Sequence, residues 1–172
     1  MTYFLDFDRT LFDTSAFIAY LMKRDGREEL RALSETDRAK ALNAAAAAGT
    51  LSFAPGELAQ FMYPDAEAFL DMHARESAIV TWGNRALQEA KLENVFSERK
   101  DLRRVYTDER KGALIAQLSK EYEKPWIFID DKIIELDSVA GALPEATLYE
   151  MRRDGKPASG AYPVLRSFSE LS

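Results

Sequence analysis

The chain has 172 residues, of which 47% are hydrophobic and 30% are charged, and its formal net charge is −6. This length and composition suit one globular domain with a small inserted subdomain. Because nucleic-acid binding requires clustered Lys and Arg, the acidic balance and the lack of a basic tract argue against a nucleic-acid partner. The chain has no cysteine and one histidine, His73, so thiolate nucleophiles, disulfides and paired-histidine sites are excluded.

The sequence gives no sign of a membrane or export segment. It lacks an apolar run of the roughly 20 residues that a membrane helix needs. Its N-terminus lacks the charged start and long apolar stretch of a signal peptide. We therefore expect a cytoplasmic protein with no membrane partner.

The first third of the chain predicts a strand followed by helices. Residues 3–7 are apolar and aromatic-rich, which is typical of a buried strand, and polar residues follow directly. Residues 15–62 have helical patterning. Within them, residues 34–37 resemble a capping box that begins an Ala-rich helix, and Gly49 is well placed to end it.

The rest of the chain alternates between predicted strands and helices. Asp65, Asn84 and Asp108 are each placed to cap the beginning of a helix. This alternation is typical of an α/β fold with a mostly parallel sheet and right-handed crossovers. The predicted strands are residues 77–81, 102–106, 125–129 and 147–151.

Polar residues stand at the predicted carboxyl ends of several strands, where open α/β sheets bind ligands. We expect the acidic ones to converge on one small region. Two unit charges 4 Å apart repel by about 4 kcal/mol at an effective dielectric constant near 20, so such a cluster requires a cation. Mg²⁺ is the usual oxygen-liganded cation beside phosphate. The acidic residues are Asp6, Asp8, Asp130 and Asp131.

Two further residues complete a site for phosphoryl transfer. Lys111, near the start of a predicted helix, supplies a positive charge, and Thr81 supplies a hydroxyl donor for a phosphoryl oxygen. Asp6 and Asp8 are two residues apart, so strand geometry would place their side chains on one face. One can then attack phosphorus while the other handles the proton.

These residues resemble the motifs of the haloacid dehalogenase-like superfamily. Residues 6–12, Asp-Phe-Asp-Arg-Thr-Leu-Phe, resemble its Asp-x-Asp-x-Thr motif. Thr81, Lys111 and Asp130-Asp131 match the second, third and fourth motifs in family order. The resemblance implies a Rossmann-like parallel sheet of order 5-4-1-2-3 in residues 1–13 and 64–172. It also implies a small inserted α-helical cap of the C1 type in residues 14–63.

The resemblance also implies residue roles. Asp6 would be the nucleophile and Asp8 the general acid/base. Mg²⁺ would be held by the Asp6 side chain, the Asp8 backbone carbonyl and an acid of the fourth motif, most readily Asp131. Asp130 and Glu135 stay open as alternative ligands or supporting groups.

Two residues depart from the family pattern. Arg9 stands where glycine is common, and Trp82 follows Thr81 where a small or polar residue is usual. Both are expected to shape the substrate pocket, and Thr10 and Asn84 are further candidates for substrate binding. Residues 152–156, which are rich in Arg and Lys, predict a solvated turn.

The predicted function is a Mg²⁺-dependent phosphatase for a small phosphorylated metabolite, with an aspartyl-phosphate intermediate on Asp6. A phosphotransferase or mutase of the same superfamily is the alternative. Dehalogenation is disfavoured by the acidic metal site, and a signalling receiver by the order of the motifs. A scaffold without catalysis is disfavoured by the full set of reactive residues. The sequence indicates neither the substrate nor the oligomeric state.

Overall fold

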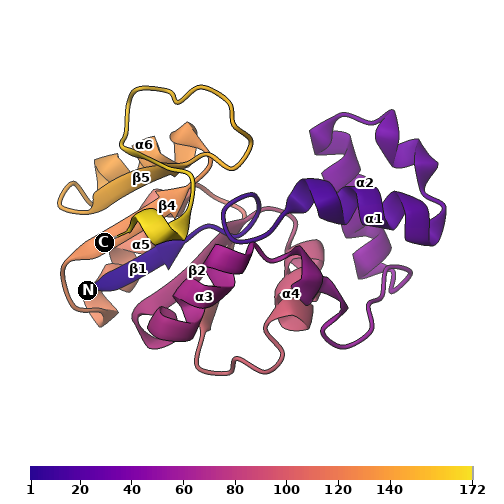
Figure 1. The fold of residues 1–172 in the computed structure, drawn as a ribbon, viewed down its shortest axis with the longest axis horizontal. Coiled ribbons are helices and arrows are strands. Elements are labelled where there is room, and N and C mark those ends of the chain that lie inside the picture. The colour runs from indigo at the N-terminus through magenta and orange to yellow at the C-terminus, as the bar shows by residue number, and fades with distance from the viewer. Residues whose placement is uncertain (172) are drawn as a thin grey trace.

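The computed structural model describes residues 1–171 and contains a six-stranded sheet of order β3-β2-β1-β4-β5-β6, all of whose strand pairs are parallel (Figure 1). The predicted order is confirmed, with β6 as an added edge strand that the sequence did not predict. The strands are β1 Thr2–Leu5, β2 Ser77–Trp82, β3 Arg103–Thr107, β4 Trp126–Asp130, β5 Thr147–Met151 and β6 Val164–Leu165.

The first strand is shorter than predicted, because the chain turns sharply after Leu5. The carbonyl of Phe7 accepts hydrogen bonds from the backbone N–H groups of Thr10, Leu11 and Phe12. These bonds close a compact turn, so residues 6–12 form a loop at the carboxyl end of β1.

Apolar side chains on both faces of the sheet explain why its central strands are buried. On one face, Phe4, Val80 and Phe128 belong to a cluster with residues of α5 and α6. On the other face, Leu5 and Ile129 belong to a cluster with residues of α3 and α4. Strands that are covered on both faces have continuous apolar sequences. The helices are α3 Pro64–His73, α4 Arg85–Val95, α5 Lys111–Leu118 and α6 Ile133–Ala142.

A helical segment stands between β1 and β2 in the chain. It contains α1 Thr14–Asp25 and α2 Glu35–Ala47, which lie to one side of the sheet in Figure 1. The Asp13 side chain caps α1, and Ser34 caps α2 as predicted by accepting a hydrogen bond from Asp37 N at 3.1 Å. The segment contacts the core where Asn43 Oδ1 accepts a hydrogen bond from Leu87 N of α4, at 3.2 Å.

Short 3₁₀ helices connect these elements, at Glu28–Arg31, Glu57–Phe61, Ala74–Glu76, Ser119–Glu121 and Phe168–Glu170. Across residues 1–171, no helix has the length and apolar character that a membrane crossing requires.

Two predicted helix caps are wrong. Asp65 lies inside the first turn of α3, because Pro64 is already helical and Tyr63 precedes it as the N-cap. Asp108 lies before α5, whose N-cap is Arg110. Asn84 is the N-cap residue of α4, although its side chain makes no capping hydrogen bond.

Candidate active site

Three carboxylates meet at the carboxyl ends of β1 and β4. Asp6, Asp130 and Asp131 each offer an oxygen, and these oxygens lie within 4.8 Å of one another. Their proximity follows from the sheet, because β1 and β4 are neighbours and Leu5 is in register with Ile129. The residues that follow this pair therefore leave the sheet at the same edge.

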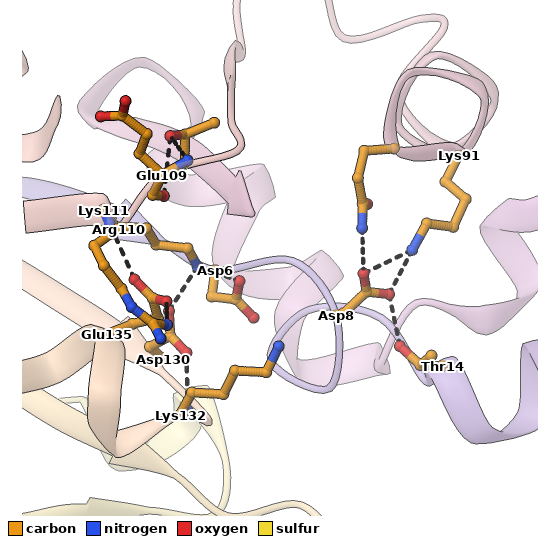
Figure 2. A network of polar contacts seen from close by, with 12 residues as sticks. Asp6, Asp8, Thr14, Lys91, Glu109, Arg110, Lys111, Asp130, Lys132 and Glu135 are labelled. Atoms are coloured by element: carbon orange, nitrogen blue, oxygen red, sulfur yellow. Dashed lines mark hydrogen bonds and ion pairs between the residues drawn. The ribbon is translucent and has the colours of Figure 1, made fainter. Parts of the chain in front are cut away.

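Lys111 joins two of these acids. Its ammonium contacts the Asp6 carboxylate and lies 2.6 Å from Asp130 Oδ2, and the side chain is 1% exposed (Figure 2). Burial alone would lower the pKa of Lys111, but the charges of Asp130 and Asp6 raise it, so the lysine is charged. Lys111 is the first residue of α5, so the position of this helix places the Lys111 ammonium next to the acids.

The cluster holds more negative charge than Lys111 balances. Burial and the neighbouring Asp6 carboxylate raise the pKa of both Asp130 and Asp131. One ammonium cannot neutralise three carboxylates, and a hard divalent cation with oxygen ligands would offset the remainder. The three carboxylates together thus form a donor set that could hold Mg²⁺.

Asp8 does not join the other acids, and this corrects the expectation that all four converge. Both Asp8 oxygens accept hydrogen bonds from Lys91, at 2.6 and 2.7 Å, and they also accept from Gln88 and Thr14 (Figure 2). The two-residue spacing from Asp6 fails as a guide because the chain leaves the strand at Leu5. Burial alone would raise the pKa of Asp8, but Lys91, Thr14 and Gln88 lower it to about 2.

The sequence did not reveal Lys91. The residue is 2% exposed, and its ammonium lies 5.3 Å and 5.6 Å from the ring centres of Phe7 and Phe12. A signal was present, because Gln88 and Lys91 share the buried face of α4 with Leu87 and Leu92. Buried cations are rare unless paired, and Asp8 is the partner here.

Three buried hydroxyls lack a partner among residues 1–171, and two of them stand at the carboxyl edge of the sheet, whereas the third, Ser77, begins β2 at the opposite edge. Thr81 at the end of β2 and Thr10 in the loop after β1 are 1% and 0% exposed. Neither hydroxyl has a hydrogen-bond partner among residues 1–171. Since buried polar groups are nearly always paired, such an unpartnered hydroxyl beside an acidic cluster suggests a ligand.

A cavity of about 840 Å³ includes Asp131 of the acidic cluster in its lining, but not Asp6, Asp130, Lys111 or Thr81. Its walls come from the loop after β1, from α1, α2 and α4, and from the carboxyl ends of β2, β3 and β4. Arg9, Trp82, Asn84 and Asp131 line it, whereas Thr10 does not. Three of the four predicted substrate-binding residues therefore face one space between the sheet and the inserted helices.

Arg9 and Trp82 both stand in unusual settings. Arg9 has a φ of 64°, a left-handed conformation that is costly for a residue with a Cβ, and its guanidinium lies 2.9 Å from Glu35 of α2. Trp82 is 40% exposed, its Nε1 donates to the Asp108 carbonyl, and the Lys132 ammonium lies 4.9 Å from its ring centre.

Solved structures share this architecture over nearly the whole chain. A protein of Burkholderia xenovorans LB400, provisionally assigned as a haloacid dehalogenase-like hydrolase, superposes with a TM-score of 0.70 at 18% identity, covering 99% of this chain and 96% of that one. YfnB of Bacillus subtilis, a provisionally assigned HAD-hydrolase bound to magnesium, gives 0.62 at 14% identity, covering 99% and 96%. A haloacid dehalogenase-like hydrolase of Streptococcus pneumoniae gives 0.58 at 13%, covering 99% and 96%.

This chain has the haloacid dehalogenase-like hydrolase fold. No protein-family model matches it, and no curated protein matches it significantly, so the fold is recognised from structure. The acidic cluster lies at the carboxyl edge of this haloacid dehalogenase-like sheet, next to its central strand.

Glu135 supports the candidate site from outside the acidic cluster. This buried carboxylate accepts a hydrogen bond from Lys111 N at 2.9 Å and one from Arg110 Nη1 at 2.6 Å. It therefore binds the beginning of α5, where Lys111 stands. Among the described residues, none donates a hydrogen bond to the Asp131 carboxylate.

Arg153 fixes the loop after β1, and the predicted solvated turn at residues 152–156 is wrong for this residue. Its side chain is 9% exposed and donates to the Thr10 carbonyl, at 3.1 and 3.3 Å, and to Asp65 at 2.8 Å. The guanidinium thereby fixes the loop after β1 against the start of α3. This role depends on a contact between residues 143 positions apart in the chain, so it becomes visible only in the tertiary structure.

Proposed function

We propose that the protein is a Mg²⁺-dependent phosphatase that hydrolyses a small phosphorylated molecule through an aspartyl-phosphate on Asp6. The observation that carries this proposal is the group of three carboxylates around the buried Lys111, beside the unpartnered Thr81 hydroxyl. Phosphoryl transfer needs this combination of a nucleophile, cations and hydroxyl donors.

In the first step, an oxygen of Asp6 attacks phosphorus and the bond from phosphorus to the ester oxygen breaks. Lys111 holds the Asp6 carboxylate in place, and Thr81 donates its hydroxyl hydrogen to a phosphoryl oxygen. Bound Mg²⁺ would supply positive charge that offsets the phosphate and the acids. In the second step, water attacks phosphorus, releases phosphate and restores the Asp6 carboxylate.

Asp8 is the proposed acid/base, which protonates the leaving oxygen and later takes a proton from water. In the described arrangement its carboxylate is ionised and bound by Lys91. The proposed role therefore requires Asp8 to separate from Lys91 and take up a proton before the first step, because an ionised carboxylate has none to donate.

We propose that residues 14–63 act as a cap over the site, and that residues 1–13 and 64–172 form the catalytic core. The cavity between α2 and the strand ends supports this division. Closure over bound ligand would exclude water. Hydrogen exchange of residues 15–62 should slow when a phosphate mimic binds with Mg²⁺, and unchanged exchange would count against a closing cap.

The neighbouring structures support the hydrolase proposal, since they are named as haloacid dehalogenase-like hydrolases and YfnB binds magnesium. The test is release of phosphate from an aryl phosphate with Mg²⁺ present. Asp6→Asn should abolish release while the circular dichroism spectrum is retained. Asp101→Asn, at an exposed position outside the site, is the matched control and should keep full activity. Activity that survives Asp6→Asn would exclude Asp6 as the nucleophile.

A further inference from the structure

The cavity wall carries more positive than negative side chains, although the whole chain carries a net charge of −6. Six cationic and four acidic side chains line the cavity. This reversal places positive charge where a substrate would lie. The cations are Arg9, Arg38, Lys40, Arg85, Lys91 and Lys132, and the acids are Asp8, Glu35, Asp108 and Asp131.

Most of the acids in the wall already have partners. Asp8 is paired with Lys91, and Glu35 is paired with Arg9. Asp131 belongs to the acidic cluster that fits a metal ion. The excess of positive charge in the wall is therefore available to a ligand.

Two of the cations have no carboxylate within 4.0 Å in residues 1–171, namely Arg38 and Lys132. Arg38 donates from Nε to the Leu30 carbonyl and from Nη2 to the Leu33 carbonyl, which leaves Nη1. Lys132 lies over the ring of Trp82 and makes no hydrogen bond through its ammonium to another described residue.

These two cations come from different walls of the cavity. Arg38 is on α2 in the inserted segment, whereas Lys132 follows Asp131 directly after β4. A phosphoryl group at the acidic cluster would leave the rest of the ester in the cavity between them. We propose that this space binds a carboxylate of the substrate, so that the protein acts on phosphorylated carboxylic acids. This inference rests on the proposed phosphatase function.

A carboxylate matches the two free donors, because it offers one oxygen to each. The Arg38 Nη1 group and the Lys132 ammonium can each donate to one carboxylate oxygen, and charge-assisted hydrogen bonds of this kind are the strong ones. General electrostatic steering by the wall would act on every phosphate ester alike, because it depends on total charge. A bound carboxylate instead favours only esters that carry one.

The test compares two three-carbon esters, 3-phosphoglycerate and glycerol 3-phosphate, which differ at the end that carries the carboxylate. With Mg²⁺ present, kcat/KM should be roughly tenfold higher for 3-phosphoglycerate, as one charge-assisted hydrogen bond would give. In Lys132→Met and in Arg38→Gln the ratio of the two kcat/KM values should fall toward one. Lys120→Gln, at an exposed position outside the cavity lining, is the control and should keep the wild-type ratio.

A wild-type ratio near one, or a ratio that Lys132→Met leaves unchanged, would overturn the proposal. If neither ester is hydrolysed, release of phosphate from the aryl phosphate shows whether the phosphatase function itself fails, and binding of the two esters then decides the inference. Each ester is added to the protein and its binding is followed by the change in Trp82 fluorescence. The Trp82→Phe variant shows which part of the fluorescence comes from Trp82. Tighter binding of 3-phosphoglycerate that is lost in Lys132→Met would uphold the carboxylate site, and equal affinities would reject it.

Discussion

Buried polar side chains of two kinds make up the site. Lys111 and Lys91 are paired with carboxylates, and each pair is buried or nearly so. The hydroxyl of Thr81 is equally buried but has no partner among the described residues. A pair stabilises its own position in the fold, whereas an unpartnered hydroxyl contributes nothing comparable to stability. Substitutions at these residues should therefore separate folding from function.

Thr81→Val should lower activity without lowering stability. Valine keeps the shape and removes only the hydroxyl, and replacing an unsatisfied buried group usually leaves stability unchanged or higher by about 1 kcal/mol. Loss of one donor to the transferred phosphoryl group should lower kcat at least roughly tenfold. Urea unfolding and phosphate release on the same preparation measure both. A loss of stability with unchanged kcat would show that Thr81 is structural.

Lys91→Met should destabilise the protein by about 3 kcal/mol, because Asp8 would be left in a largely buried position without its cation. Asp8→Asn combined with Lys91→Met should cost less than the sum of the two single changes, since the pair acts as a unit. Urea unfolding of all four proteins in the cycle gives the coupling free energy. Additive losses would mean that the two side chains do not stabilise each other.

Packing between α5 and α6 places Lys111 at the acids. Gly112, which follows Lys111, lies so close to α6 that a Cβ there would be 2.1 Å from the Ser138 carbonyl oxygen. Its backbone N–H donates to Ser138 Oγ at 3.1 Å. A side chain at this position would push the two helices apart and carry Lys111 with them.

Gly112→Ala should destabilise the protein by about 3 kcal/mol through this overlap with backbone atoms. It should also lower activity in the fraction that stays folded, because Lys111 would shift. Gly141→Ala in α6 is the matched control, since its Cβ would meet nothing within 4 Å. The control should be neutral or more stable by up to about 1 kcal/mol, as is usual for this change in a helix. Thermal unfolding of both variants measures this difference in stability. Equal unfolding midpoints for the two variants would contradict the packing argument.

Burial of several like charges makes the stability of the whole molecule depend on pH and Mg²⁺. The folded-state pKa values of Asp130 and Asp131 are raised above the ordinary value by burial and by Asp6. These two groups therefore bind more protons in the folded protein than in the unfolded chain above about pH 4. These two groups favour folding at low pH, and their contribution is lost as pH rises toward their folded pKa values.

In EDTA, this contribution predicts a free energy of unfolding that falls as pH rises from about 4 to about 8. Mg²⁺ should reverse the trend, because it binds the ionised acids of the folded state. At about 100 times its dissociation constant, it should add about 2.7 kcal/mol. Urea unfolding at several pH values, with EDTA or with Mg²⁺, measures this. Asp131→Asn should remove most of the Mg²⁺ effect, and an undiminished effect would place the ion elsewhere.

The sequence by itself determined which segments form strands and helices, because apolar runs and helix patterns depend on neighbouring residues. The order of the strands in the sheet was implied by the family resemblance of the motifs. The strands at residues 77–81 and 147–151 are found within one residue of their predicted limits. The sequence also indicated that Asp6, Asp130 and Asp131 come together, since the carboxyl ends of adjacent parallel strands share one edge.

Only the tertiary structure decided what surrounds these acids. Lys91 meets Asp8 across 83 positions in the chain, and Arg153 meets Thr10 across 143. Neither pairing has a local signature, because each depends on how a helix or a loop packs against the turn after β1. The same turn separates Asp8 from Asp6, although the spacing predicted a common face. Local patterns determine which residues form helices and strands. Long-range packing determines where the charged side chains lie and which of them remain free to bind a ligand.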